Sequence, residues 1–338
     1  MATYGAKALS RIAVAKQADF DTAATIDATH GEILFNDAIG VLDAGVTVAL
    51  GEDIAAGKRT AIKAGAVTVT GRNPMVNIAE APVSMRALPL LLGNLGGTVS
   101  GAGPYTWTWS PAQGDVDTAN YLSVLVTDGI QKYKAVSAAV TEMTISADAS
   151  GIMQAGATLA AKSVATSSDA YPTALPAQPM LVGRLLKLGI DTNFPDKAGT
   201  GITAYDHLLS FNLSVTSGMA MVNALNGSLL SATAAFNQPL DATLTITVAS
   251  NAAAIANGAW GIDEQGEQRY LRIFGTTADS YGVWILGSWV IESVTPISAE
   301  QDGLVVNEVT LRLAYDTTAG KSLEIVCDSP LSALPAGA

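Results

Sequence analysis

Few residues in this chain have types and spacings that could do chemistry. The closest approach to a metal site is the segment 27–32, in which Asp27, His30 and Glu32 could supply three ligands. We interpret this segment as a solvated loop instead. No serine stands in a G-x-S-x-G turn, although a Ser/His/Asp arrangement built from distant residues stays open. We therefore predict a non-catalytic protein that uses no cofactor and no metal.

The other reactive or aromatic residues also have structural explanations. His207 precedes two leucines and is expected at the entry to a strand. Cys327 ends the apolar run 323–326 and is expected to be a buried small hydrophobe and not a nucleophile. The glycines between Gly93 and Gly103 match neither G-x-G-x-x-G nor a phosphate loop, so we predict a turn before the next strand.

The tryptophans stand among apolar residues with few basic neighbours. We favour core or subunit-interface packing for them over stacking on bases or sugars. They are Trp107, Trp109, Trp260, Trp284 and Trp289.

One acidic group could be functional. Asp263, Glu264 and Glu267 offer enough carboxylates for calcium but lack the Asp-x-Asp-x-Asp-Gly spacing of a calcium loop. Two interpretations remain: a solvated loop, or an acidic patch at the rim or on the wall of a channel.

Composition indicates a self-associating protein. The 338 residues suffice for two domains, and charged residues make up 14%, well below the ~25% of typical soluble domains. A subunit that covers much of its surface with neighbours fits this scarcity of charge. The net charge of −12 argues against a protein that grips DNA or RNA. A single cysteine excludes an intrachain disulfide and favours a reducing compartment.

Two kinds of apolar segment are not found in the sequence. No run approaches the ~18 apolar residues of a membrane span. The first twenty or so residues lack the apolar core of a signal peptide. We therefore expect no contact with a membrane.

Strand patterns dominate the chain. Residues alternate with a period of two over 67–70, 105–109, 243–248 and 309–313, as in half-buried antiparallel strands. Short helices are predicted over 83–95 and over 250–259, the second with Ser250 as N-cap. The predicted fold class is all-β with one or two short helices.

Two long segments carry little strand pattern. Residues 37–63 are glycine-rich and are expected to form loops or a hairpin arm, and residues 163–179 are rich in Ser and Pro. We expect neither to supply core strands, and at least one to reach a neighbouring subunit or the next ring of an assembly.

An internal duplication is predicted across the second of these segments. An offset of 149 maps Tyr121 onto Tyr270 and Val124 onto Ile273, and similar elements follow in the same order. We predict a β-sandwich domain over 1–165, a linker over 166–179 and a second β-sandwich over 180–338. The alternative is that antiparallel strands at similar spacing merely look alike.

Several segments taken together match the pattern of a known family. They are the opening 1–14, the stretch 88–97, the Thr-Trp-Thr-Trp strand in 104–111, the strands of 121–161, and the ending 302–315 with 322–327. On these segments the chain resembles the major tail tube proteins of long-tailed, non-contractile bacteriophages. The likeness is one of pattern over most of the chain, and no single motif is diagnostic. The extended 37–63 region and the long linker depart from the family pattern.

The resemblance implies a structural subunit of the phage tail, made in the bacterial host cytoplasm and located in the virion. Six β-sandwich domains of this type form a ring, and their inner strands join into a β-barrel around a channel that DNA crosses without specific binding. Tape-measure and tail-terminator proteins would be partners, beside copies of the chain itself. If each chain supplies two domains, three chains complete a ring; six chains is the alternative. We expect acidic side chains to outnumber basic ones on the channel wall.

Two other functions are weighed against this one. A carbohydrate-binding or adhesin-like β-sandwich of a tail tip or surface structure would also explain the strands and tryptophans. It would not require a duplication. An esterase or glycosidase on a β scaffold is the least supported of the three.

Overall fold

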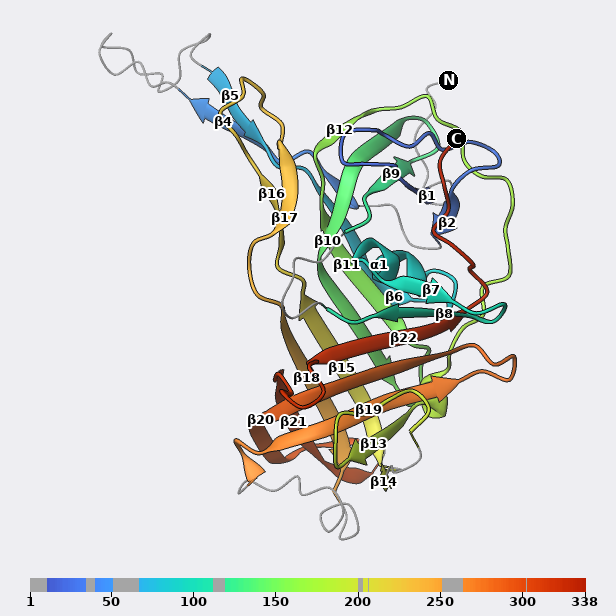
Figure 1. The fold of residues 1–338 in the computed structure, drawn as a ribbon, viewed down its shortest axis with the longest axis vertical. Helices are drawn as coiled ribbons and strands as arrows, with labels where there is room; N and C mark the ends of the chain where they lie inside the picture. Colours follow the sequence, from blue (N-terminus) through green and yellow to red (C-terminus); the bar gives the residue numbers. More distant parts are fainter. Residues whose placement is uncertain are drawn as a thin grey trace, which may run out of the picture.

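The computed structural model describes residues 11–34, 40–50, 67–111, 119–199, 203–205, 207–250, 264–301 and 303–338. Strands account for 55% of the chain, and the described part contains one α-helix (Figure 1). The all-β fold class predicted from the alternating patterns is therefore confirmed.

The chain divides into an amino-terminal half, residues 11–166, and a carboxy-terminal half, residues 187–329. The strands of the amino-terminal half are β1 (Arg11–Lys16), β2 (Glu32–Leu34), β3 (Leu42–Asp43), β4 (Val46–Leu50), β5 (Val67–Arg72), β6 (Met75–Pro82), β7 (Thr98–Ser100), β8 (Tyr105–Trp109), β9 (Leu122–Thr127), β10 (Lys132–Asp148), β11 (Gln154–Ala160) and β12 (Ser163–Thr166). Helix α1 (Leu88–Asn94) lies between β6 and β7. A short 3₁₀ turn, η3 (Gly183–Leu185), precedes the second half.

The carboxy-terminal half has fewer described elements. Its strands are β13 (Lys187–Asp191), β14 (Thr203–Tyr205), β15 (Leu208–Thr216), β16 (Met219–Val222), β17 (Thr233–Phe236), β18 (Asp241–Ala249), β19 (Gln268–Thr276), β20 (Gly282–Gln301), β21 (Leu304–Leu313) and β22 (Leu323–Ser329).

The two halves pair their strands in the same order. In the amino-terminal half, β1 pairs with β2 and β9, and β9 and β12 flank the first part of β10. The second part of β10 pairs with β11, which continues to β6 and β3. The carboxy-terminal half repeats these pairings. There, β13 pairs with β14 and β19, and β19 and β22 flank the first part of β20. The second part of β20 pairs with β21, which continues to β18 and β15. All of these ladders are antiparallel.

Register breaks align the halves residue by residue. The β10–β11 ladder shifts between Val140 and Glu142, and the β20–β21 ladder shifts between Ile291 and Ser293. Val140 thus corresponds to Ile291, and Thr144 to Thr295. The cross-strand partners then correspond as well. In the amino-terminal half, Val140 lies opposite Leu159, which lies opposite Val76, which lies opposite Leu42. In the carboxy-terminal half the same series is Ile291, Leu311, Leu244 and Leu213.

The halves are joined edge to edge. The second part of β10 pairs with β15, from Glu142 opposite Thr216 to Asp148 opposite Ser210. This contact makes one continuous sheet in the order β3, β6, β11, β10, β15, β18, β21 and β20, which we call the joint sheet. Strand β8 pairs with β22 as a second link between the halves.

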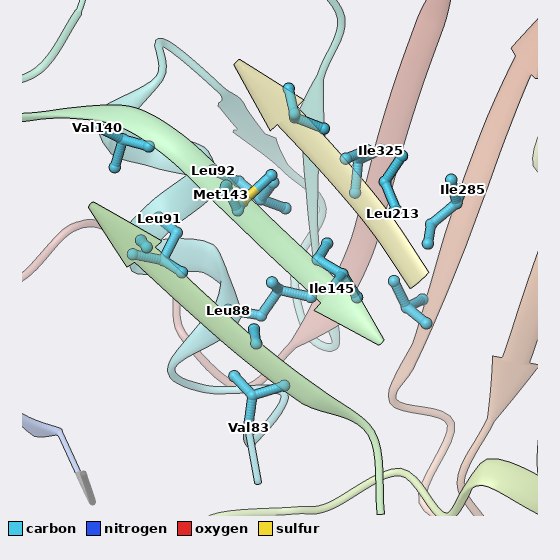
Figure 2. Packing of buried hydrophobic residues seen from close by; sticks show 14 of the residues in the cluster. Val83, Leu88, Leu91, Leu92, Val140, Met143, Ile145, Leu213, Ile285 and Ile325 are labelled. Atoms are coloured by element: carbon cyan, nitrogen blue, oxygen red, sulfur yellow. The ribbon is translucent and has the colours of Figure 1, made fainter. Parts of the chain in front are cut away.

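The largest hydrophobic cluster runs from Ile12 to Leu334 and includes residues of both halves. Figure 2 shows part of it, with Leu92 of α1 beside Met143 of β10. The two predicted sandwich domains therefore share one core. Their boundaries at 165 and 180 stay a prediction.

Several predicted segments differ in extent from the structure. Helix α1 is shorter than predicted and is buried throughout. Pro89 lies in its first turn. The four residues of β12 pair with β10, so the start of the 163–179 segment is a strand and not a linker. Its β-branched residues explain this, since they favour an extended chain. The helix predicted over 250–259 falls almost wholly outside the described residues.

The hairpin of β4 and β5 takes only its first strand from the 37–63 region, for which loops or a hairpin arm were predicted. Strands β4 and β5 pair with each other and leave the joint sheet between β3 and β6. Contrary to expectation, the two residues of β3 do join the sheet, by pairing with β6. The hairpin of β16 and β17 leaves between β15 and β18, and the two hairpins project together from one side of the molecule (Figure 1). The backbone N–H of Arg72 donates to Leu229 O at 3.2 Å, which ties them side by side.

Candidate functional site: the polar face of the joint sheet

The two faces of the joint sheet differ sharply in chemistry. Successive residues of a strand point to opposite faces. One face carries apolar side chains that enter the core, for example Ile145, Leu213 and Leu244, each fully or almost fully buried. Figure 2 shows Ile145 and Leu213 on this side. The other face, which we call the polar face, carries mostly Thr, Ser, Asn and acidic residues.

Strand pairing arranges the polar face into rows that cross both halves. Residues directly opposite each other in neighbouring strands share a face. The first row is Asn77, Thr158, Glu142, Thr216 and Asp241. The second is Gly156, Thr144, Ser214, Thr243 and Arg312. The third is Gln154, Ser146, Asn212, Thr245, Thr310 and Ser293, and the fourth is Asp148, Ser210, Thr247, Glu308 and Thr295.

Acidic groups outnumber basic ones on this face. Carboxylates come from different strands of the sheet: Glu142, Asp148, Asp241 and Glu308 in the rows, and Glu80, which accepts a hydrogen bond from the Ser146 hydroxyl. The one cation in the four rows is Arg312, whose Nη2 lies 2.7 Å from Asp241 Oδ2. Its Nη1 lies 4.0 Å from Glu292 Oε1. The guanidinium is thus already engaged by neighbouring carboxylates.

The acidic group singled out in the sequence lies elsewhere. Asp263 falls outside the described residues. Glu264 and Glu267 both form ion pairs with Arg269, at the start of β19 and off the four rows. Their place at a channel rim stays a prediction.

The three candidate metal ligands do not converge. Asp27 Oδ1 accepts hydrogen bonds from the backbone N–H groups of Thr29 and His30 at 2.8 and 2.9 Å, and contacts His30 Nδ1 at 2.9 Å. These contacts, the Thr29 amide first, hold the pKa of Asp27 well below its usual range. Glu32 is bound instead by Arg86, with Nε and Nη2 donating at 2.6 and 2.9 Å. Within the described residues no group of three His, Cys, Asp or Glu side chains could hold a metal.

The other candidate residues are structural. Cys327 is fully buried in β22, and burial raises the pKa of its thiol far above the ordinary value. A protonated, buried thiol is a poor nucleophile. His207 lies directly before β15 and packs edge-on against Tyr205 at 5.7 Å between ring centroids.

Core packing is confirmed for the described tryptophans. Trp107, Trp109, Trp284 and Trp289 are each at most 8% exposed. Trp107 Nε1 donates to Leu331 O at 2.7 Å, which fixes the chain after β22. Trp260 falls outside the described residues.

The acidic residues of the polar face escaped sequence reasoning. Each strand contributes only one or two of them, so they form no local cluster in the chain. The usable signal was the polar half of each alternating pattern, such as the threonines of β18, which marks a solvated sheet face.

Comparison with known proteins adds no identification. No family model matches the chain, and a comparison with curated proteins finds no match. In the described part of the chain, no helix combines the length and apolarity that crossing a membrane requires.

Proposed function

We propose that this protein is the structural subunit of a phage-type tail tube, and that the polar face of the joint sheet lines its channel. The observation that carries the proposal is the repeated pairing order, with the two halves joined edge to edge into one sheet. A chain that already links two like units through strand edges has a geometry that further copies can extend.

The chemistry of the polar face suits a channel for DNA. Lys and Arg side chains that neutralise phosphates supply most of the affinity of proteins for DNA. A wall of hydroxyls and carboxylates offers no such neutralisation and repels the backbone, so DNA passes without adhering. The proposal is therefore a non-catalytic function, located in the virion tail.

Three chains per ring follow from the duplication. Six like units surround the channel in the tail tubes that the sequence resembles, and each chain here carries two units with matching ladders. Closed rings are the natural product of head-to-tail contacts that close on themselves. We propose a ring with threefold symmetry and a pseudo-sixfold appearance.

The paired hairpins are proposed to connect neighbouring rings. Both project from the same side of the molecule (Figure 1) and carry exposed apolar side chains, including Val46 at 46% and Leu229 at 45%. Exposed apolar groups on a projecting arm favour burial against another subunit. Tape-measure and tail-terminator proteins remain proposed partners on the same basis as the tube itself.

Electron microscopy of the purified chain tests the proposal. We expect rings or tubes with a central hole, and threefold symmetry in a cryo-electron reconstruction. Dispersed globules at all protein concentrations would contradict the tube. Six identical chains in each ring would contradict the trimer but leave the tube intact. The carbohydrate-binding alternative gains no support from the described tryptophans, because all four are buried.

A further inference from the structure

The contact between β10 and β15 occurs once among the described strands. In the alignment of the halves, β20 corresponds to β10 and β3 corresponds to β15. The second part of β10 is paired on both sides, by β11 and by β15. The second part of β20, from Ser293 to Gln301, pairs with β21 on one side and with no described strand on the other.

Side chains near the open side of β20 are exposed. Ser293 and Thr295 are exposed, and Ile297, which lies within the register shift between Thr295 and Ala299, is 76% exposed. Val294, between them, is buried on the core side as its counterpart Met143 is. The match to β10 thus covers Ser293, Val294 and Thr295, and beyond it residues 295–300 are all exposed, with a register shift between Thr295 and Ala299.

The opposite end of the joint sheet is equally open. Strand β15 has nine residues and pairs with β18 along its whole length, whereas its counterpart β3 has two. Leu42 in β3 is the counterpart of Leu213 in β15, because Leu42 lies opposite Val76 and Leu213 lies opposite the corresponding Leu244. On its outer side β3 pairs with no described strand.

We propose that the open side of β20 in one copy of this chain pairs antiparallel with β3 and the following residues of a second copy. The register is that of β10 and β15. Since Thr144 lies opposite Ser214 within the chain, Thr295 of one copy lies opposite Asp43 of the next. Val294 then lies opposite Ala44.

A second copy is the occupant because the chain already holds the same contact internally. The two open ends are the counterparts of the two strands that pair inside the chain, so they are complementary and not self-complementary. Such a contact is head-to-tail and generates closed rings or open filaments. The inference rests on the self-assembly in the proposed function and names the surfaces that carry it.

Cysteine cross-linking tests the register. The double variant Thr295→Cys with Asp43→Cys places two exposed thiols at directly opposed positions, where Cα atoms lie about 4.5–5.5 Å apart. The native Cys327 is fully buried and contributes no background. Under mild oxidation of the assembled protein we expect a ladder of covalent multimers on non-reducing gels that ends at the ring size. Mixing the two single variants should give covalent dimers only.

Two matched variants serve as controls. Thr144→Cys with Ser214→Cys is the same pair inside the chain and should form an intrachain disulfide without multimers. Ser293→Cys with Asp43→Cys is shifted by two residues, and diagonal positions lie about 7–8 Å apart, too far for a disulfide. We expect at least a tenfold lower yield of multimers from this shifted pair.

The outcomes separate the interface from the function. One outcome would overturn the interface and leave the tube assignment standing. In that outcome, microscopy shows rings or tubes and the intrachain control forms its disulfide, but Thr295→Cys with Asp43→Cys gives no covalent multimers. Equal yields from the matched and shifted pairs would overturn the register. Dispersed chains that never cross-link would overturn both proposals.

Discussion

The two halves of the molecule place different groups at the same position of the same ladder. Ala138 in β10 and Trp289 in β20 are corresponding residues. Ala138 lies two residues before Val140, and Trp289 lies two residues before Ile291, where the register of each ladder shifts. At Ala138 the helix α1 docks, with Asn94 Nδ2 donating to Ala138 O at 3.0 Å and Val140 N donating to Asn94 Oδ1 at 2.6 Å. At Trp289 a fully buried indole occupies the position. The ladder is shared, whereas the described side chains at these two positions differ.

A polar side chain in each half holds a neighbouring loop. These side chains are Ser123 in β9 and Arg272 in β19. Ser123 Oγ accepts a hydrogen bond from Ala24 N at 3.0 Å. Arg272, 2% exposed, donates to Asp196 O and Gly199 O, both at 2.8 Å. A hydroxyl anchors the nearer loop, and a longer guanidinium anchors the other.

The largest effect is expected from Trp289→Ala. Removing this tryptophan should cost about 4 kcal/mol of the free energy of unfolding, because its side chain is fully buried in the core. Denaturant titration measures the loss. Thr245→Ala on the polar face is the control and should stay within about 0.5 kcal/mol of the parent. A cost below about 1 kcal/mol for Trp289→Ala would mean that another group fills the position.

Removing the loop anchor should also cost more free energy of unfolding in the carboxy-terminal half than in the amino-terminal half. Arg272→Ala leaves the carbonyls of Asp196 and Gly199 and the carboxylate of Asp191 without this partner, and should cost about 3 kcal/mol. Ser123→Ala removes one hydrogen bond and should cost about 1 kcal/mol. Both are read from the same unfolding titration. Equal costs would show that the two anchors are not distinguished by their charge and burial.

Two aspartates should respond to pH in opposite directions. Burial raises the pKa of Asp169, but the N–H of Ile26 and the ammonium of Lys134 lower it by more, so the net pKa is lowered. Its contribution is present above the ordinary value of 3.8 and is lost as pH falls through the lowered pKa. Burial raises the pKa of Asp191 despite the nearby Arg272. Its contribution is present below 3.8 and is lost as pH rises through the raised pKa.

Asparagine variants test these signs. Asp169→Asn should cost about 1–2 kcal/mol at pH 7, and the cost should shrink as pH falls below about 4. Asp191→Asn should cost little at pH 7, because its site already disfavours the charged form. Unfolding titrations between pH 3 and 7 give both profiles. Parallel profiles for the two variants would refute the assigned causes.

The smallest effect on folding, and the most informative for function, is expected on the polar face. Glu142 and Glu308 lie in different halves and are both exposed. Replacing both by lysine should leave the free energy of unfolding within about 0.5 kcal/mol. It should give the assembled protein a salt-dependent affinity for DNA that the parent lacks. Filter binding at two salt concentrations measures this, with Glu264→Lys and Glu267→Lys as the control pair off the rows. Equal gains from both pairs would argue against a channel wall on the joint sheet.

The sequence by itself determined the local elements. Period-two alternation identified the strands at 105–109, 243–248 and 309–313, because each has one buried and one solvated face. It also indicated the order shared by the two halves, and the burial of Cys327 and of the four described tryptophans. It did not indicate β12, since a four-residue strand of this kind forms only where β10 provides an edge.

Tertiary structure decided the rest. Which strand edges meet depends on long-range pairing, so the β10–β15 contact and the open sides of β20 and β3 had no signal in any local pattern. The polar face became a site only when that pairing brought Glu142, Asp241 and Glu308 onto one surface from strands about a hundred residues apart in sequence. A carboxylate on an alternating strand indicates that this side of the strand is solvated. Which other carboxylates lie beside it on that face depends on the strands that pair with it.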